Sequence, residues 1–214
     1  MAEKQIIIKN VRCMYSNLKE PYVPKEGGAG KPKFSITVLI PKKDKATVKQ
    51  IMDYMDEVVK ESSHTPGIKK LILSTAKNTD PANNNCFLRD GDKLNEYYEM
   101  KGKEKKNAFV GSWVLNVKRP VDFGRAMIVT EKNEKILPEF LDAELQSGYW
   151  VNVAATPYPY SGVTTSFALT LQAVQRVKVD DSLNTPDSPF AALDDVAVEE
   201  STGDSPFNDD ASPL

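Results

Sequence analysis

Apolar and polar residues alternate most clearly over residues 33–40. One set of alternating positions is apolar and consists of Phe34, Ile36, Val38 and Ile40. The positions between them are polar at Lys33, Ser35 and Thr37. Successive side chains of a strand point to opposite faces, so this segment predicts a strand with one face in the core. Its other face would be open to solvent or to a ligand.

Other β-rich segments occupy most of the first 180 residues. Strands are predicted at 5–15, 108–117, 126–130, 148–155 and 166–179, and a further short strand at 71–73. Residues 78–85 read as a loop, and the Asp90–Gly91 pair predicts a turn at 89–92. Many short strands joined by long connections predict a mainly β domain, an antiparallel barrel or sandwich with insertions.

One segment has a clear helical period. Asp44 can cap a helix that runs to about Ser62, and its apolar stripe contains Val48, Ile51, Met52, Met55, Val58 and Val59. A short helix is also predicted at 139–146, after Pro138. We therefore expect one principal helix in a mainly β protein.

The charge of this 214-residue chain is divided sharply along its length. All 28 Lys and Arg residues precede residue 180, whereas ten of the 30 acidic residues follow residue 179. Residues 1–179 therefore carry a formal charge of +8, and residues 180–214 carry −10. This division favours a nucleic-acid-binding domain at 1–179 followed by an acidic tail at 180–214. A neutral globule with a solubilising terminus is the alternative interpretation.

The acidic segment has the composition of a disordered tail. It is rich in Pro, Ser and Asp and has no helical or strand period, so it cannot bury enough surface to offset the cost of ordering. The sequence Asp-Ser-Pro-Phe occurs twice, at 187–190 and 204–207. Isolated apolar residues in such a chain can anchor a partner protein. The predicted partner-binding residues are Phe190, Phe207, Asp209, Asp210, Pro213 and Leu214.

Several functional classes are made improbable by what the sequence lacks. No apolar run reaches the roughly 18 residues that span a bilayer, and the first residues lack the pattern of a signal peptide. Cys13 and Cys86 are expected to be reduced core residues, and His64 is the sole histidine, in a predicted loop. Pro32 stands where a phosphate-binding loop needs Ser or Thr. We expect no metal and no cofactor.

Binding of single strands without sequence preference requires cations for the phosphates and flat aromatic faces for the bases. The candidate cations are Lys33, Arg89, Lys101, Lys103, Lys105, Lys106, Lys118, Arg119 and Arg125. The candidate stacking residues are Trp150, on the polar face of its predicted strand, and Tyr158 and Tyr160, which alternate with prolines in a predicted stiff turn. Trp113 and Phe34 are assigned to the core.

Asp90 and Asp92 allow a different function. Two carboxylates at this spacing could hold Mg²⁺ and activate water, as in a nuclease. An Asp-Gly-Asp sequence is more often a turn, and no third ligand stands at a suggestive spacing. A second alternative is an interaction or decoy protein that acts through its acidic tail. A non-catalytic single-stranded DNA-binding protein remains the leading hypothesis.

Several short motifs resemble a family of tailed-phage single-stranded DNA-binding proteins. They lie at 87–92, 107–110, 118–122, 147–151 and 167–176, and the resemblance covers most of residues 4–180. It implies an OB-fold, a five-stranded antiparallel barrel with long loop insertions. It also implies that the protein coats exposed strands during phage DNA replication or recombination, in the cytoplasm of an infected bacterial host.

The tail also resembles those of bacterial and phage single-stranded DNA-binding proteins. It is acidic and ends in Pro213 and an apolar residue, here Leu214 where many such tails have Phe. This implies that replication or recombination proteins bind the tail, and that the tail can compete with DNA for the basic domain. An exposed strand edge could pair two copies into a homodimer. No membrane partner is expected.

Overall fold

The computed structural model describes residues 4–24, 31–83 and 85–180. The chain divides into two compact units, residues 1–184 and 185–214, and every described residue belongs to the first. The tail residues singled out above, from Phe190 to Leu214, therefore lie outside the described residues. Among the described residues, no helix is long and apolar enough to cross a membrane.

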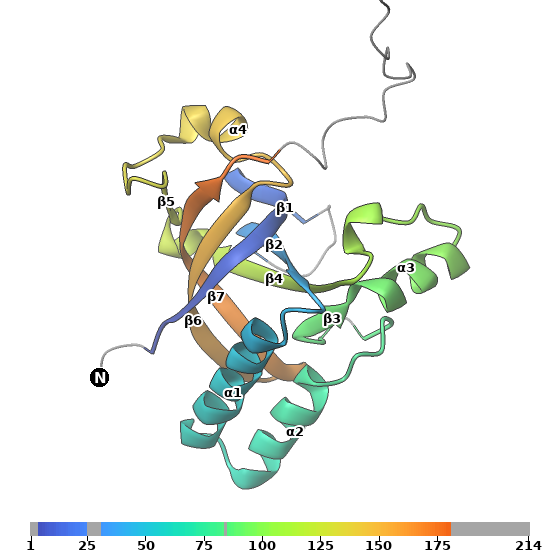
Figure 1. Ribbon diagram of the computed structural model, residues 1–214. Coiled ribbons are helices and arrows are strands. Elements are labelled where there is room, and N and C mark those ends of the chain that lie inside the picture. Colours follow the sequence, from blue (N-terminus) through green and yellow to red (C-terminus); the bar gives the residue numbers. More distant parts are fainter. Residues whose placement is uncertain (1–3, 25–30, 84, 181–214) are drawn as a thin grey trace, which may run out of the picture. The chain divides into compact units, whose positions relative to one another are not determined.

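Five long strands form a closed barrel (Figure 1). They are β1 (Ile6–Tyr22), β2 (Lys33–Pro41), β4 (Ser112–Pro120), β6 (Trp150–Ser161) and β7 (Thr165–Lys178). Neighbouring strands run antiparallel in the order β4-β2-β1-β6-β7. A parallel contact between β4 and β7, where Lys118 faces Thr170, closes the barrel. The predicted OB-fold-like five-stranded barrel is confirmed.

The core is built from the alternation that the sequence shows. Phe34, Ile36, Val38 and Ile40 are all buried inside the barrel. Their neighbours on β4 face the same interior, since Ile36 pairs with Val117 and Val38 pairs with Leu115. Cys13 and Cys86 are buried and not cross-linked, as expected.

The structure contains more helix than predicted. α1 (Lys45–Glu61) is confirmed, with the Asp44 carboxylate accepting from the Thr47 N–H as its N-cap. The predicted strand at 71–73 is wrong, because it lies in α2 (Pro66–Ala76), which starts with Pro66 and buries Ile72 and Ala76. α1 and α2 lie together at one end of the barrel (Figure 1).

The predicted turn at 89–92 is also wrong. Residues 88–90 form a short strand, β3 (Leu88–Asp90), which pairs with β4, and α3 (Gly91–Met100) follows directly. Asp90 accepts from the N–H groups of Asp92 and Lys93, so the Asp-Gly pair starts a helix. A Cβ on Gly91 would lie 2.2 Å from the Phe109 carbonyl oxygen, so only glycine fits at this start. The expectation of one principal helix must therefore be revised to three helices of ten or more residues within the described chain.

The remaining elements connect the strands. They are η1 (Asn107–Phe109), η2 (Val121–Phe123), β5 (Met127–Val129), η3 (Pro138–Phe140) and α4 (Leu141–Glu144). The predicted strand at 126–130 is confirmed as β5, which adds to β7. The predicted helix at 139–146 is shorter and begins as a 3₁₀ turn. Tyr158 and Tyr160 lie within β6, so the expected stiff turn is wrong.

Candidate nucleic-acid interface

The outer faces of β2 and β4 have two different surfaces. Near one end, Leu39 pairs with Val114, and both are covered by the small apolar cluster that also contains Met14, Leu94 and Phe109. Farther along, Thr37 pairs with Asn116 and Ser35 pairs with Lys118, so the same faces become polar. The change from apolar to polar residues marks where α3 and η1 stop covering the barrel.

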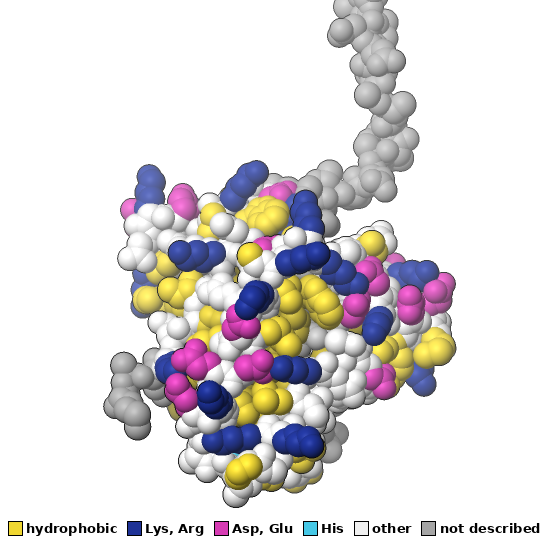
Figure 2. Space-filling model, turned by 60° about the horizontal axis from the view of Figure 1, so that its bottom comes forward, with side chains coloured by type: hydrophobic (Ala, Val, Ile, Leu, Met, Phe, Trp, Pro, Cys, Tyr) yellow, Lys and Arg dark blue, Asp and Glu magenta, His cyan; other side chains and the backbone are white. Residues whose placement is uncertain are grey.

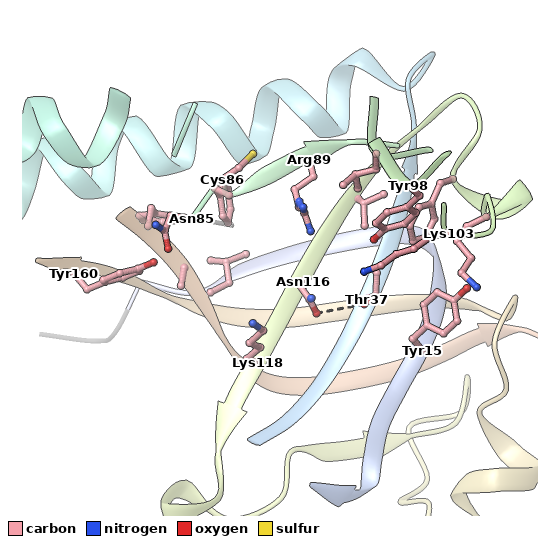
Figure 3. Close-up of a pocket in the computed structure, with 18 of the residues that line it drawn as sticks. Tyr15, Thr37, Asn85, Cys86, Arg89, Tyr98, Lys103, Asn116, Lys118 and Tyr160 are labelled. Carbon is pink, nitrogen blue, oxygen red and sulfur yellow. Dashed lines mark hydrogen bonds between the residues drawn. The ribbon is translucent and has the colours of Figure 1, made fainter. Parts of the chain in front are cut away.

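A cleft of about 730 Å³ lies over the polar part of these strands. Its walls come from β3, α3, the loop after α3, and the ends of β6 and β7 that meet in a hairpin. Figure 3 shows Tyr160 and Asn85 at one end of this cleft and Tyr15 and Tyr98 at the other. In OB-folds, the face formed by the second and third barrel strands is a usual surface for oligonucleotides. β2 and β4 hold those positions here.

The middle of the cleft carries positive charge that no acidic residue offsets. Lys118 is exposed on the cleft floor, and Figure 3 shows its side chain and that of Arg89 reaching into the same space from opposite walls. Burial by the cleft walls, with the charges of Lys33 and Arg89, lowers the pKa of Lys118. Within the described residues, none of the ion pairs involves Lys33, Arg89 or Lys118. Binding of an anion between them would relieve this repulsion.

Arg89 is held so that part of its guanidinium remains without a partner. Its Nη2 donates to the Pro81 carbonyl at 3.1 Å, which fixes the side chain against the loop before β3. Its Nε is buried and has no hydrogen-bond partner among the described residues. A buried donor without an acceptor is costly, and a phosphate oxygen could supply the missing acceptor.

The lysine-rich loop after α3 is fixed by one buried amide. Asn95 is 5% exposed, and its side chain makes two hydrogen bonds to the backbone of Lys106. Its Nδ2 donates to the Lys106 carbonyl at 3.0 Å and its Oδ1 accepts from the Lys106 N–H at 2.9 Å. Lys103 and Lys106 line the cleft. Asn95 therefore positions the loop that brings both lysines to it.

Replacing Asn95 with Ala should free this loop and remove up to two phosphate contacts. We expect the slope of log K against log salt for a bound oligonucleotide to become shallower by about 1, at ~0.7 for each contact. The measurement is a fluorescence-anisotropy titration at several salt concentrations, together with circular dichroism to establish that the variant folds. Asn78→Ala is the matched control, because Asn78 bonds the backbone of an exposed loop. An unchanged slope in folded Asn95→Ala would refute the positioning role.

Aromatic rings stand at both ends of the cleft. Tyr160 lines it, and the ring of Tyr158, which is 58% exposed, stacks on that of Tyr160 at 5.7 Å between centroids. At the other end Tyr15 is 47% exposed and meets Phe109 edge to face. Tyr15 has a positive φ of 45°, an uncommon backbone conformation for a non-glycine residue. Partly exposed rings beside cations are the features that single-strand binding requires.

Other predicted residues lie outside the residues that line the cleft. Arg119 donates to the carbonyls of Phe123, Gly124 and Leu171, so its guanidinium joins β4, η2 and β7. Arg125 lies over the Phe34 ring and donates to the Lys19 carbonyl. The cleft therefore collects five of the predicted residues: Arg89, Lys103, Lys106, Lys118 and Tyr160.

Trp150 and two lysines also have partners of their own. The Trp150 indole N–H donates to Asp180 at 2.9 Å, and the guanidinium of Arg12 lies 5.2 Å from the indole ring while pairing with the same carboxylate. Lys105 pairs with Glu99 at 2.9 Å, and Lys101 lies over the Tyr97 ring. DNA would have to displace these partners in order to use the same groups.

The acidic pair considered for metal binding holds a lysine. The Lys42 ammonium lies 2.6 Å from Asp90 Oδ1 and 2.7 Å from Asp92 Oδ2. Asp92 also accepts from the Gly111 N–H at 2.9 Å, and these bonds lower the pKa of Asp92. The two carboxylates therefore join the end of β2, the start of α3 and the start of β4, which is a structural role. In the described part of the chain, no group of three or more His, Cys, Asp and Glu residues is placed to hold a metal ion.

Basic residues elsewhere on the surface do not form one continuous band. On the face shown in Figure 2, Lys and Arg side chains are interspersed with Asp and Glu. Many of these cations are in ion pairs, such as Lys4 with Glu57 and Glu61, and Lys77 with Asp56. The unpaired cations of the cleft therefore matter more than the overall excess of positive charge.

Sequence reasoning missed several residues of the cleft. Tyr15, Thr37, Asn85, Tyr98 and Asn116 all line it but were not among the candidates. Thr37 gave a signal, since it lies on the polar face of the predicted strand at 33–40. Asn116 gave the same signal on its own strand, between the buried Leu115 and Val117. Tyr15 gave none, because its exposure depends on a local irregularity of β1.

A family model decides the relationship of this chain to known proteins. Residues 4–204 match the model described as Enterobacter phage Enc34, ssDNA-binding protein. The chain belongs to this family. The Enc34 family membership confirms the resemblance inferred from the sequence motifs. No curated protein matches the chain.

Solved structures of the Enc34 protein agree with this assignment. The single-stranded DNA-binding protein from bacteriophage Enc34 in complex with ssDNA has a TM-score of 0.60 and 24% identity, over 82% of this chain and 87% of that one. A second structure of the single-stranded DNA-binding protein from bacteriophage Enc34 has a TM-score of 0.58 and 26% identity, over 82% of both chains. Its C-terminal truncation has a TM-score of 0.59 and 25% identity, over 82% of this chain and 86% of that one.

Proposed function

We propose that this protein binds single-stranded DNA without catalysis and with little sequence preference, in the cleft over β2 and β4. The observation that carries the proposal is the unpaired cationic centre formed by Lys33, Arg89 and Lys118, with tyrosines at both ends of the same cleft. Membership of the Enc34 family supports it, as does the related structure of the Enc34 protein in complex with ssDNA.

The proposed role is to coat exposed strands during phage DNA replication or recombination, in the cytoplasm of an infected bacterial host. The cleft suits this role because its cations can follow a backbone and its rings can accept any base. Thr37 and Asn116 add hydrogen-bonding groups on the floor, 3.3 Å apart, that could contact base edges. The nuclease alternative loses its basis, since Lys42 bridges the two carboxylates on which it relied.

Binding should depend steeply on salt. If the cleft contacts about five phosphates, log K should fall against log salt with a slope near −3.5, at ~0.7 for each phosphate of a single strand. The test is an anisotropy titration of a labelled oligo-dT at four or more salt concentrations, with and without Mg²⁺. Absence of binding at low salt would end the proposal, and shortening of the oligonucleotide would revive the nuclease alternative.

We further propose that the acidic segment from residue 180 has two roles. Its negative charge would compete with DNA for the basic cleft, and the anchors at Phe190, Phe207 and the terminal Leu214 would bind replication or recombination proteins. The charge of −10 against +8 on residues 1–179 supports the first role. The repeated Asp-Ser-Pro-Phe sequence supports the second. A homodimer formed through a strand edge remains part of the proposal.

A chain that ends at Asp180 should bind oligo-dT more tightly than the full chain, and most of all at low salt, where screening is weakest. Ending at Asp180 keeps the partner of Arg12 and Trp150 in place. The measurement is the same titration on both chains at about 20 and about 200 mM salt, concentrations chosen so that the screening length differs about threefold. A control of full length with its tail acids changed to amides separates charge from bulk. Equal affinities for all three chains would refute competition.

A further inference from the structure

Lys118 differs from the other lysines of the cleft in its surroundings. It projects from the floor at the point where β4 meets β7. Its amine is exposed to the cleft, and no carboxylate among the described residues pairs with it. Its neighbours are the cations of Lys33 and Arg89. An accessible amine beside other cations, with walls that exclude part of the solvent, is an arrangement that activates a lysine as a nucleophile.

The charge state of this lysine is consistent with such activation. Burial, then Lys33, then Arg89 lower the pKa of Lys118 below its ordinary value of 10.5. Only the neutral amine has the lone pair that attacks a carbonyl. Each lowering of the pKa by one raises the neutral fraction at pH 7 about tenfold. Lys118 therefore holds more of the reactive form than an ordinary surface lysine.

Single-stranded DNA contains one electrophile that suits an amine. An abasic nucleotide has lost its base, and its deoxyribose opens to expose an aldehyde at C1′. Inside the cleft such a nucleotide would leave empty space where a base would have stacked on Tyr160. The sugar could then approach the floor, where Lys118 stands.

We propose that Lys118 forms a reversible covalent bond with the aldehyde of an abasic site in single-stranded DNA bound in the cleft. The inference rests on the proposed DNA-binding function. The amine lone pair attacks C1′, the carbonyl electrons move to the oxygen, and that oxygen takes up a proton. The carbinolamine then loses water and becomes an imine between Nζ and C1′. No oxidant or reductant takes part, and hydrolysis returns both partners.

This chemistry adds to the function of a strand-coating protein. A plain binding protein would hold an abasic nucleotide less well than a normal one, because that nucleotide offers no base to stack on a ring. An imine would compensate for that loss and would retain the protein at the damaged position. It would also shield the aldehyde from other nucleophiles while the strand is single.

Reductive trapping tests the proposal on the full chain. A labelled oligo-dT with one central abasic site, made by removing uracil, is saturated with protein, and its occupancy is measured by anisotropy. Cyanoborohydride is then added, and it reduces the imine to a stable amine. We expect a denaturant-resistant protein–DNA product, mapped to Lys118 by peptide mass spectrometry. The intact oligo-dT should be bound and yield no product.

Matched substitutions identify the reacting amine. Lys118→Arg keeps the positive charge but cannot form the imine, so at equal measured occupancy it should lose trapping by at least about tenfold. Lys103→Arg and Lys106→Arg change other lysines of the cleft in the same way and should still be trapped. The yield with Lys118 should also level off at a lower pH than that of a free lysine peptide.

Two results would overturn the proposal. One is the absence of trapped product from a fully occupied abasic oligonucleotide. The other is a product that maps to different amines and persists in Lys118→Arg. A failure to bind the intact oligo-dT would instead overturn the proposed function, so the two failures are distinguishable.

Discussion

Replacing Tyr160 with Ala should weaken the binding of a single-stranded oligonucleotide by about 5- to 150-fold, which corresponds to stacking worth ~1–3 kcal/mol. Tyr160 lines the cleft and is supported from behind by the stacked ring of Tyr158. A ring already held in place loses little freedom when a base stacks on it. The affinity of the variant for oligo-dT, measured by anisotropy at fixed salt, gives the effect.

Two companions make this result specific to the ring. Tyr160→Phe keeps the stacking face and should bind nearly as well as the unchanged protein. Trp150→Phe alters a ring that is already in contact with Arg12 and Asp180, and it should change affinity much less than Tyr160→Ala. The assignment of Tyr160 would fail if Tyr160→Phe and Tyr160→Ala were equally impaired, or if Trp150→Phe caused the larger loss.

Replacing Lys118 with Met should have opposite effects on binding and on stability. Removal of one charged contact to phosphate should lower affinity by about tenfold and make the salt slope shallower by ~0.7. The free protein should become more stable, because Met does not carry a charge beside Lys33 and Arg89. Thermal unfolding and the DNA titration measure the two effects on the same sample.

The pH dependence follows from the direction of the shift. Folding lowers the pKa of Lys118, so the folded state disfavours the charged amine and loses stability at every pH below its folded value. This loss decreases as the pH rises through the folded pKa towards the unfolded value of 10.5. The stability advantage of Lys118→Met should therefore be largest near neutral pH and diminish in alkali. Lys49→Met is the control, since Lys49 pairs with Asp53 on the exposed side of α1. A destabilised Lys118→Met with unchanged affinity would contradict the account.

Local patterns were sufficient to predict the barrel strands. The alternation over 33–40 identified both the buried face of β2 and the polar face that forms the cleft floor. The helical period over 44–62 identified α1 and its cap. In each case the signal lies within one segment, where burial on one side alone decides the pattern.

The two missed helices depended on contacts distant in sequence. Residues 71–73 are apolar enough for a strand, and only packing of Ile72 and Ala76 against the core makes that segment helical. The Asp90–Gly91 pair fits a turn or a helix start equally well. The close approach of Gly91 to Phe109, eighteen positions later, distinguishes the two and is visible only in the folded chain.

The candidate site was predicted by residue type more than by place. Arg89 and Lys118 were both expected to contact phosphate, but only the pairing of β3 with β4 brings Arg89 to the cleft wall. Arg119, the neighbour of Lys118, points its guanidinium at backbone carbonyls. A sequence shows that a residue is charged, whereas the fold determines whether a partner already occupies it.

Photo-cross-linking tests the central claim, that the cleft over β2 and β4 is the path of single-stranded DNA. An oligo-dT carrying 5-iododeoxyuridine at single positions would be irradiated in complex with the full chain, and the attached peptides mapped by mass spectrometry. We predict attachment at Tyr160 and at Tyr15 or Tyr98, the rings at the two ends of the cleft. Attachment at Trp150 or Phe123, with the cleft tyrosines unmodified, would contradict the account.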